Sequence, residues 1–290
     1  MHKFLRAIGF SDITKKDLEM ILDEVITRPE IMKITKDSEG NEFAELSGSF
    51  AANAGITVRG TYQEDDSFHM DYYYPYVFGT SITTNEQIDV EKHAEKESYA
   101  GVCDEVNLGV TLIFYIQNVA DYLAEANRHL SKIHYGAMLA GLSTEGKILC
   151  PVVERKKNDV PAIQKNDRHN QLIAQAREGD EDAIESLTLE DMDTYALLSQ
   201  RVMKEDIFSI VKSTFMPFGI ESDQYTVLGE IIDCVTMENR LTHEKLYGMK
   251  LLCNNIQFDV CINEKDLLGE PAIGRRFRGN VWMQGTLCLE

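Results

Sequence analysis

Hydrophobic positions follow a helical period near the start of the chain and strand patterns after it. Between Lys15 and Thr27 the apolar residues gather on one helical face, which predicts an amphipathic helix. A shorter helix is predicted for residues 2–10, where Gly9 can end it. Beyond Pro29 turn-forming sequences separate four expected strands: Ile31–Lys36, Glu42–Phe50, Gly55–Tyr62 and Phe68–Phe78. This order predicts an antiparallel meander.

The middle of the chain combines one strongly apolar segment with a predicted helix and a predicted hairpin. The run Val110–Ile116 is hydrophobic at nearly every position, which favours a central strand covered on both faces. Asn118 can cap a following helix, Val119–Leu130. Two further segments, Ile133–Leu142 and Lys147–Val153, are expected to pair as a hairpin across the turn between them.

Two polar stretches interrupt these elements. Val90–Lys96 is expected to be a short charged helix or a linker, and Glu154–Asn170 a domain boundary or a loop. After the second stretch the chain is acidic and helical in pattern. Carboxylates suited to helix starts predict four helices, at residues 171–177, 180–187, 188–203 and 205–215.

Strand patterns return in the last seventy residues. Four strands are expected there: Tyr225–Thr236, Leu246–Cys253, Ile256–Ile262 and Phe277–Leu289. The pair Asn254-Asn255 can take the left-handed conformations that a two-residue hairpin turn needs. Open edges this apolar would aggregate, so the pattern favours a small barrel or rolled sheet.

These segments predict an α+β protein in three parts. Residues 1–157 are expected to form a mixed, mostly antiparallel domain. Residues 158–216 follow as an acidic helical segment, and residues 217–290 as a C-terminal β domain. The length of 290 residues agrees with about two units that each bury a core.

Composition and charge narrow the classes of function. A formal net charge of −19 repels polyanions, so neither nucleic acid nor an anionic membrane is an expected partner. The six cysteines form no Cys-x-x-Cys pair, and His93 with Glu97 lacks a third ligand, so we expect no metal and no cofactor. The opening residues lack a secretory signal, and no apolar run has membrane-spanning length, which predicts a cytoplasmic protein. The partner, protein or small molecule, and the oligomeric state stay open.

The candidate site lies in the glycine-rich and arginine-rich stretch 266–285, which also holds the only tryptophan. Gly269 and Gly274 have the spacing of a phosphate loop, but Arg275 and Arg276 replace its lysine and hydroxyl residues, and a strand follows. A structural turn is therefore favoured over a phosphate site. The residues that bring charge and aromatic character together there are Glu270, Arg275, Arg276, Arg278 and Trp282.

Strand alternation divides the end of this stretch between two faces. Phe277, Gly279, Val281 and Met283 share one face, which we expect to be buried. Arg276, Arg278, Asn280 and Trp282 share the other face, where guanidinium stacking on the indole is available. That face is either a seam against the acidic helices at residues 178–193, which we favour, or an exposed recognition patch.

The tyrosine run at residues 72–76 allows two interpretations. Aromatic side chains line many binding pockets, but tyrosine is also a normal occupant of a half-buried sheet face. On a strand Tyr72, Tyr74 and Tyr76 point one way and Tyr73 points the other way. The sheet-surface interpretation is favoured.

Four stretches resemble a known family: His2–Phe10, Leu112–Asn118, Gly179-Asp180-(x2)-Ala183-Ile184, and the segment from Gly269 to Gly279. The chain is similar, over nearly its full length, to an uncharacterised family of cytoplasmic proteins from anaerobic Gram-positive (Clostridia-type) bacteria. That family is a domain of unknown function. The resemblance implies a bacterial cytoplasmic setting, and it implies no activity, cofactor or catalytic residue.

Two hypotheses of function follow. The first is a non-catalytic binding or regulatory module, because no complete catalytic constellation is found in the sequence. The second is an enzyme or metabolite-binding protein with a site around Glu270, Arg275, Arg276, Arg278 and Trp282. A convergent pocket holding two of these arginines would favour the second hypothesis. A flat surface would favour the first, towards which the sequence leans.

Overall fold

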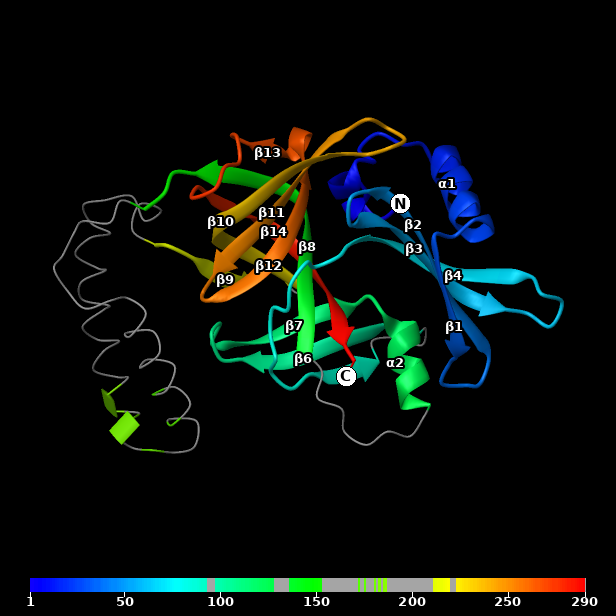
Figure 1. Cartoon of the computed structure of the whole chain (residues 1–290), viewed down its shortest axis with the longest axis horizontal. Helices are drawn as coiled ribbons and strands as arrows, with labels where there is room; N and C mark the ends of the chain where they lie inside the picture. The colour runs from blue at the N-terminus through cyan, green and yellow to red at the C-terminus, as the bar shows by residue number, and fades with distance from the viewer. Residues whose placement is uncertain are drawn as a thin grey trace.

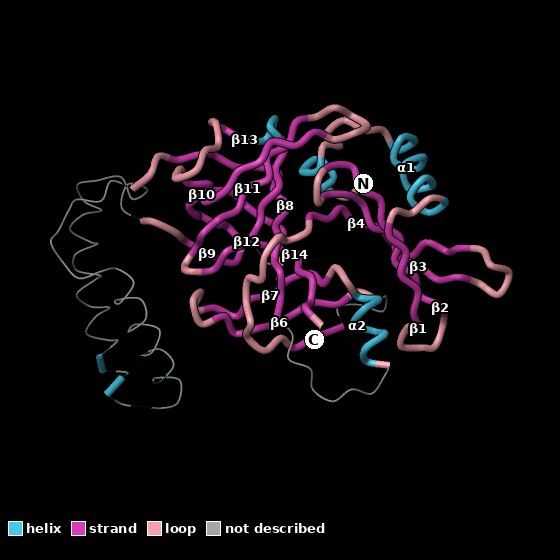
Figure 2. The backbone as a smooth tube through the Cα atoms, viewed as in Figure 1, coloured by secondary structure: helices cyan, strands magenta, loops and turns pink. Residues whose placement is uncertain are grey.

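The structure is a computed structural model that describes residues 1–92, 97–127, 136–152, 211–219 and 223–289, with a few single positions between 172 and 186. Within these residues the protein is mostly β and has few helices, whereas the sequence predicted an α+β protein (Figure 2). Most of the helices that we predicted fall within residues 171–215, of which the structure describes only those single positions and residues 211–215. No described helix combines the length and the apolar character needed to cross a membrane.

The N-terminal part is a four-stranded antiparallel sheet, as predicted. Its strands pair in chain order and are β1 (Ile31–Lys36), β2 (Glu42–Ala51), β3 (Ala54–Tyr62) and β4 (Phe68–Val77). Helix α1 (Lys15–Thr27) has the predicted bounds, and a capping box between Thr14 and Asp17 begins it. The first segment is a 3-10 helix, η1 (Lys3–Ile8), which ends at Gly9 with a φ of 91°.

The second sheet has ten strands in the described part of the chain. Five of them close a mixed barrel, because β8 pairs with β12 on one side and with β14 on the other (Figure 1). The barrel strands are β8 (Gly136–Leu149), β10 (Gln224–Glu238), β11 (Lys245–Cys253), β12 (Ile256–Asn263) and β14 (Arg276–Cys288). The predicted C-terminal barrel is therefore present. One of its strands, β8, comes from the region before residue 157.

The remaining strands extend this sheet away from the barrel. The end of β14 pairs in parallel with β7 (Val110–Ile116), and β6 (Tyr99–Glu105) and β5 (Asp89–Lys92) follow. Two short strands, β9 (Thr214–Pro217) and β13 (Leu267–Leu268), pair with β10 and β8. A 3-10 turn, η2 (Glu264–Asp266), precedes β13. The division of the chain into three parts stays a prediction, and limited proteolysis between residues 154 and 166 would test it.

Three predicted elements are wrong. The hairpin at residues 133–153 is one continuous strand, β8, because β14 pairs with it along its whole length and a bulge absorbs one residue near Ser143. Residues 89–92 form strand β5 beside β6, where we expected a helix or linker. Residues 214–215, the expected end of a helix, belong to β9, since pairing with β10 overrides their helical pattern.

Two further expectations hold in part. Strand β7 is central, but only Leu112, Phe114 and Ile116 are fully buried, so it is completely covered on one face alone. Helix α2 (Val119–Ala126) begins where predicted, yet the side chain of Asn118 does not cap it. That side chain instead exchanges two hydrogen bonds with the backbone of Leu287 in β14.

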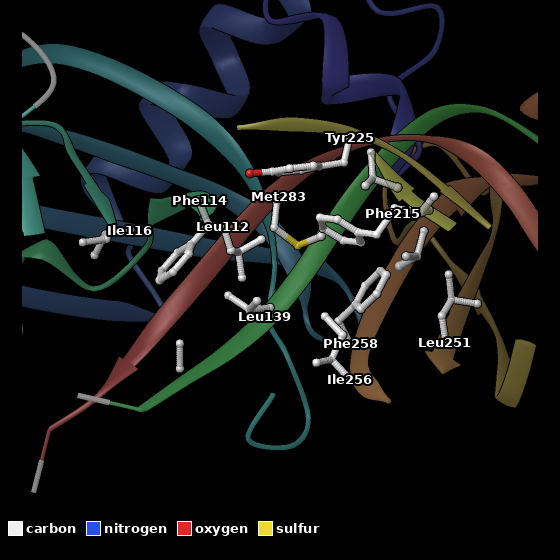
Figure 3. Close-up of a cluster of buried hydrophobic side chains, with 14 of the residues drawn as sticks. Leu112, Phe114, Ile116, Leu139, Phe215, Tyr225, Leu251, Ile256, Phe258 and Met283 are labelled. Carbon is white, nitrogen blue, oxygen red and sulfur yellow. The ribbon is translucent and has the colours of Figure 1, made fainter. Parts of the chain in front are cut away.

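Two apolar cores hold the molecule together. The larger core fills the barrel and continues under β7 and α2, with Phe258, Leu251 and Met283 at most 1% exposed (Figure 3). The smaller core lies between α1, η1, the four-stranded sheet and the barrel wall, and it includes Leu22 and Phe50. The asparagine turn between β11 and β12 has the expected left-handed residues, with φ values of 46° and 68°.

Candidate functional site

The five residues proposed from the sequence are not brought together. Glu270 and Arg275 lie exposed in the loop between β13 and β14. Arg275 donates a hydrogen bond to the backbone carbonyl of Glu270 at 2.6 Å, which closes this loop on itself. The two side chains are therefore parts of an exposed turn, as the structural interpretation of Gly269–Gly274 expected.

Arg276 is buried, and backbone carbonyls hold its guanidinium in place. It is 5% exposed, and its guanidinium donates to the backbone carbonyls of Cys150 at 2.9 Å and Val211 at 2.5 Å. Burial lowers its pKa from the usual value. These contacts tie the end of β8 and the start of the segment leading into β9 to the barrel wall.

The two faces of β14 are as predicted, but the partner of Trp282 is not. Phe277, Val281 and Met283 face the barrel core. Trp282 is 6% exposed on the other face, where it stacks on Phe4 at 5.2 Å and donates its Nε1–H to Asp223 at 2.7 Å. Trp282 therefore packs against the N-terminal helix η1, whereas the acidic helices of the predicted seam lie outside the described residues apart from single positions.

The reason is distance along the strand. Arg278 and Trp282 lie four positions apart on β14, about 13 Å at strand rise, so the element that covers one side chain need not cover the other. Sequence alternation assigns both residues to one face, and it cannot say what packs on each part of that face.

Of the five residues, Arg278 lines a hollow of about 390 Å³ on the outer barrel wall. Glu145 and Lys147 of β8 stand beside it, and the exposed apolar side chains of Phe218 and Leu268 border it. Its floor is the paired glycines Gly146 and Gly279, where a Cβ would come within 2.5 Å of the Phe277 ring. These two glycines leave room for the Phe277 ring of the barrel core beneath the hollow.

A second and more enclosed site lies between the two sheets. It is a cleft of about 230 Å³. One wall comes from the four-stranded sheet, through Ile31, Lys33, Glu45, Ser47 and Thr57. The opposite wall comes from the second sheet and its connections, through Phe78, Gly79, Gln117, Asn118, Met138 and Thr286. Polar side chains from both sheets therefore converge on one interior space.

A buried arginine organises the four-stranded side of this interface. Arg59 of β3 is 0% exposed, and its guanidinium contacts the Glu45 carboxylate at 2.6 Å. It also donates to the hydroxyls of three tyrosines and to the carbonyls of two residues, namely Tyr72, Tyr74, Tyr115, Ile116 and Gln117. Such complete pairing is what makes a buried charge tolerable.

The electrostatics of this cluster keep it in one charge state. Burial alone would lower the pKa of Arg59, but the surrounding Tyr115, Tyr74 and Glu45 outweigh burial and raise it well above the usual value. Burial also raises the pKa of Tyr74 and of Tyr115. The guanidinium therefore stays charged and the phenols stay neutral over the range in which proteins fold.

Glu45 connects the cluster to helix α2. Its Oε2 accepts the backbone N–H of Ala120 at 2.6 Å, so it caps the helix from a distant strand. A carboxylate at this end also suits the helix dipole. Glu45 thus performs the capping that the sequence assigned to Asn118.

The sequence analysis missed this cleft because its signal is ambiguous. In β2 the polar residues Glu45, Ser47 and Ser49 alternate with Ala44, Leu46 and Gly48, and this pattern normally means one buried and one solvated face. Both faces are in fact covered. The tyrosine run was one available hint, since Tyr72 and Tyr74 point into this interface.

Comparison with known proteins places the chain in a family. A family model described as "Domain of unknown function, E. rectale Gene description (DUF3881)" matches residues 5–285. The chain belongs to the DUF3881 family. The match covers both sheets and the barrel, so the cleft and the hollow lie within the DUF3881 domain. Searches of curated proteins and of solved structures gave no match. DUF3881 has no established function, so function has to be argued from the site.

Proposed function

We propose that the protein is a non-catalytic binding or regulatory module, and that its ligand occupies the cleft between the two sheets. The observation that carries this proposal is the lining of the cleft. Its polar side chains come from both sheets and are already paired within the protein. Because these pairs fix the positions of the polar side chains, the cleft has a defined shape and a few placed polar groups, as binding pockets do.

The separation of the arginines supports the same proposal. A metabolite site around Glu270, Arg275, Arg276, Arg278 and Trp282 would need at least two of the arginines to converge. Arg276 is held by backbone carbonyls, and Arg275 binds its own loop. A cytoplasmic setting without nucleic-acid or membrane partners is part of this proposal, and the net charge of −19 favours it.

Methyl NMR can test the proposal directly, because Met138 lines the cleft and Met216 is an exposed methionine on β9. A library of small fragments is titrated into protein labelled at the methionine methyl groups. We expect a subset of fragments to shift the Met138 signal in a saturable way and to leave Met216 unchanged. Fragments that shift both signals alike, or a Met138 signal that no fragment shifts, would contradict the proposal.

Two neighbouring residues of β1 provide matched variants. Ile31 borders the cleft, and Met32 is the next residue of the same strand, on the opposite face, with a similar exposure of 42% against 49%. Ile31→Trp is expected to fill the mouth of the cleft and to abolish the fragment shifts at Met138. Met32→Trp adds the same side chain outside the cleft and should leave them intact.

The hollow around Arg278 is a second candidate site. Its combination of Arg278, Lys147 and Glu145 with exposed Phe218 and Leu268 favours a mixed polar and apolar ligand. Fragments that compete at this hollow are expected to shift the Leu268 methyl signals, and Arg278→Ala, which removes a lining side chain, should weaken that response. Shifts at Leu268 without shifts at Met138 would favour this site over the cleft.

A further inference from the structure

The charges that line the cleft are balanced inside the protein. Glu45 is paired with Arg59, and the ammonium of Lys33 at the rim contacts Asp121 of α2 at 2.5 Å. Both carboxylates thus have a cationic partner already. A charged ligand would lose its hydration on entering and would find no free counter-ion among these groups. The balance of charge therefore favours an uncharged ligand.

The amide orientations at the second sheet follow from the backbone. Gln284 donates from Nε2 to the carbonyl of Pro75 at 2.8 Å, which identifies its nitrogen. Gln117 donates from Nε2 both to the carbonyl of Val77 and to Oε1 of Gln284, each at 2.8 Å. Because both hydrogens of this amide are used, Gln117 offers its Oε1 alone, and that oxygen accepts the proton of Thr286 at 2.9 Å. The Thr286 oxygen is left as an acceptor at the cleft.

The same reasoning applies to the donor and acceptor roles of the hydroxyls in the four-stranded sheet. The carbonyl of Gln117 can only accept, so Tyr74 donates its phenol proton to it at 3.0 Å. Ser47 and Thr57 share a hydrogen bond of 2.8 Å, in which either hydroxyl can be the donor. In either direction the Ser47 oxygen keeps a lone pair that can accept a hydrogen bond from a ligand in the cleft.

The remaining wall is apolar. Ile31, Phe78 and Met138 border the cleft. Its volume of about 230 Å³ is below the range of about 300–1,000 Å³ typical of sites for drug-sized ligands. The site therefore suits a small molecule with one polar end and one apolar end.

We infer that the cleft binds a small uncharged molecule whose hydroxyl or amide N–H donates to Ser47 and Thr286 and whose hydrocarbon part packs on Ile31, Phe78 and Met138. This inference rests on the proposed function, since it names the class of ligand for the same cleft. The ligand is recognised by donated hydrogen bonds and by size, and charge excludes its ionised analogues.

Three probes of equal chain length test the inference: 1-pentanol, pentanoate and pentylammonium. Each is titrated into the full chain at pH 7, and the Met138 methyl signal is followed. We expect saturable binding of 1-pentanol with an affinity at least tenfold higher than that of either ion. Ser47→Ala should weaken pentanol binding several-fold. Ser49→Ala is the matched control, because Ser49 lies on the same strand but bonds to Tyr76 outside the cleft.

The outcomes separate the two proposals. If pentanoate or pentylammonium shifts Met138 as strongly as pentanol, and Ile31→Trp removes the shift, the cleft binds ligands but the inference about neutrality is wrong. If Ser47→Ala leaves pentanol affinity unchanged, the hydrogen bond assigned from the ligand to Ser47 is wrong. If none of the three probes and no library fragment shifts Met138, the proposed function itself fails.

Discussion

The barrel interior and the face between the two sheets are both buried, but they exclude water by different means. Apolar side chains such as Phe258, Leu251 and Met283 fill the barrel core. The face between the sheets instead holds a guanidinium, a carboxylate and several hydroxyls, every one of them hydrogen bonded. The polar interface also leaves a cleft between the two sheets.

This difference determines how substitutions in each region affect stability. An apolar core loses stability roughly in proportion to the hydrocarbon removed. A polar interface depends on matching, because removal of one partner leaves the other buried and unpaired. The comparison predicts that the two regions respond differently to single and to double substitutions.

The largest expected effect is at the ion pair. Arg59→Met is expected to lower the free energy of unfolding by about 3–5 kcal/mol, because it leaves the Glu45 carboxylate buried without its cation. Arg59→Met combined with Glu45→Leu should recover at least half of this loss. Urea unfolding of the two variants and of the parent measures both values. An additive double variant would show that the pair is not coupled.

In the barrel the expected effect is large but cannot be rescued in this way. Leu251→Ala should cost about 2–5 kcal/mol, since it leaves a cavity in an apolar core where Leu251 is 0% exposed. Val235→Ala, at a position 53% exposed on β10, is the control and should change stability by less than about 0.5 kcal/mol. The same urea series measures both, and equal effects would contradict the position of the core.

A smaller effect is expected at the ion pair of Glu244 with Lys265. Burial alone would raise the pKa of Glu244, but hydrogen bonds from Lys265, Ser11 and Asn263 outweigh it and lower the pKa. A lowered carboxyl pKa stabilises the fold above the unfolded value of about 4.3, and this contribution is lost as pH falls through the folded value.

The melting temperature, followed from pH 6 to pH 3, checks this prediction. Glu244→Gln should flatten the part of the decline that lies below about pH 4.5. Added salt should weaken the contribution, because Lys265 is about half exposed, and it should leave the Arg59 pair unaffected. A parent and variant with identical pH profiles would assign the acid sensitivity elsewhere.

The smallest expected effect concerns Trp282, the only tryptophan. Because the indole is 6% exposed beneath η1, iodide should quench its fluorescence only weakly in the folded protein and strongly in urea. Phe4→Ala removes the stacked ring and should increase quenching while the barrel stays folded. Strong quenching in the parent would indicate an open N-terminal seam.

Much of the fold was predictable because it depends on local patterns. Helix α1 and strands β1 to β4 appear at or within a residue of their predicted bounds, and the asparagine turn has its left-handed residues. The hairpin expected within β8 is absent. Ser143–Gly146 has the composition of a turn, but continuous pairing with β14 holds this segment extended. Long-range hydrogen bonding outweighs the local turn propensity there.

The candidate site could not be predicted from local sequence patterns to the same extent. Of the five residues proposed, Arg278 lines a hollow, and the other four serve turns or packing. The cleft residues Ser47, Thr57 and Gln117 are ordinary polar residues without a motif. Their importance depends on two strands and a sheet junction meeting in space, which no spacing along the chain records.

The sequence by itself determined which residues share a face of each strand, because successive side chains must alternate. It determined that Phe277, Val281 and Met283 would lie on one side and Arg278 and Trp282 on the other. Only the tertiary structure decided what covers each face: η1 over Trp282, and a second polar sheet over Ser47 and Arg59. Alternation is a property of one strand, whereas burial requires a partner from elsewhere in the chain.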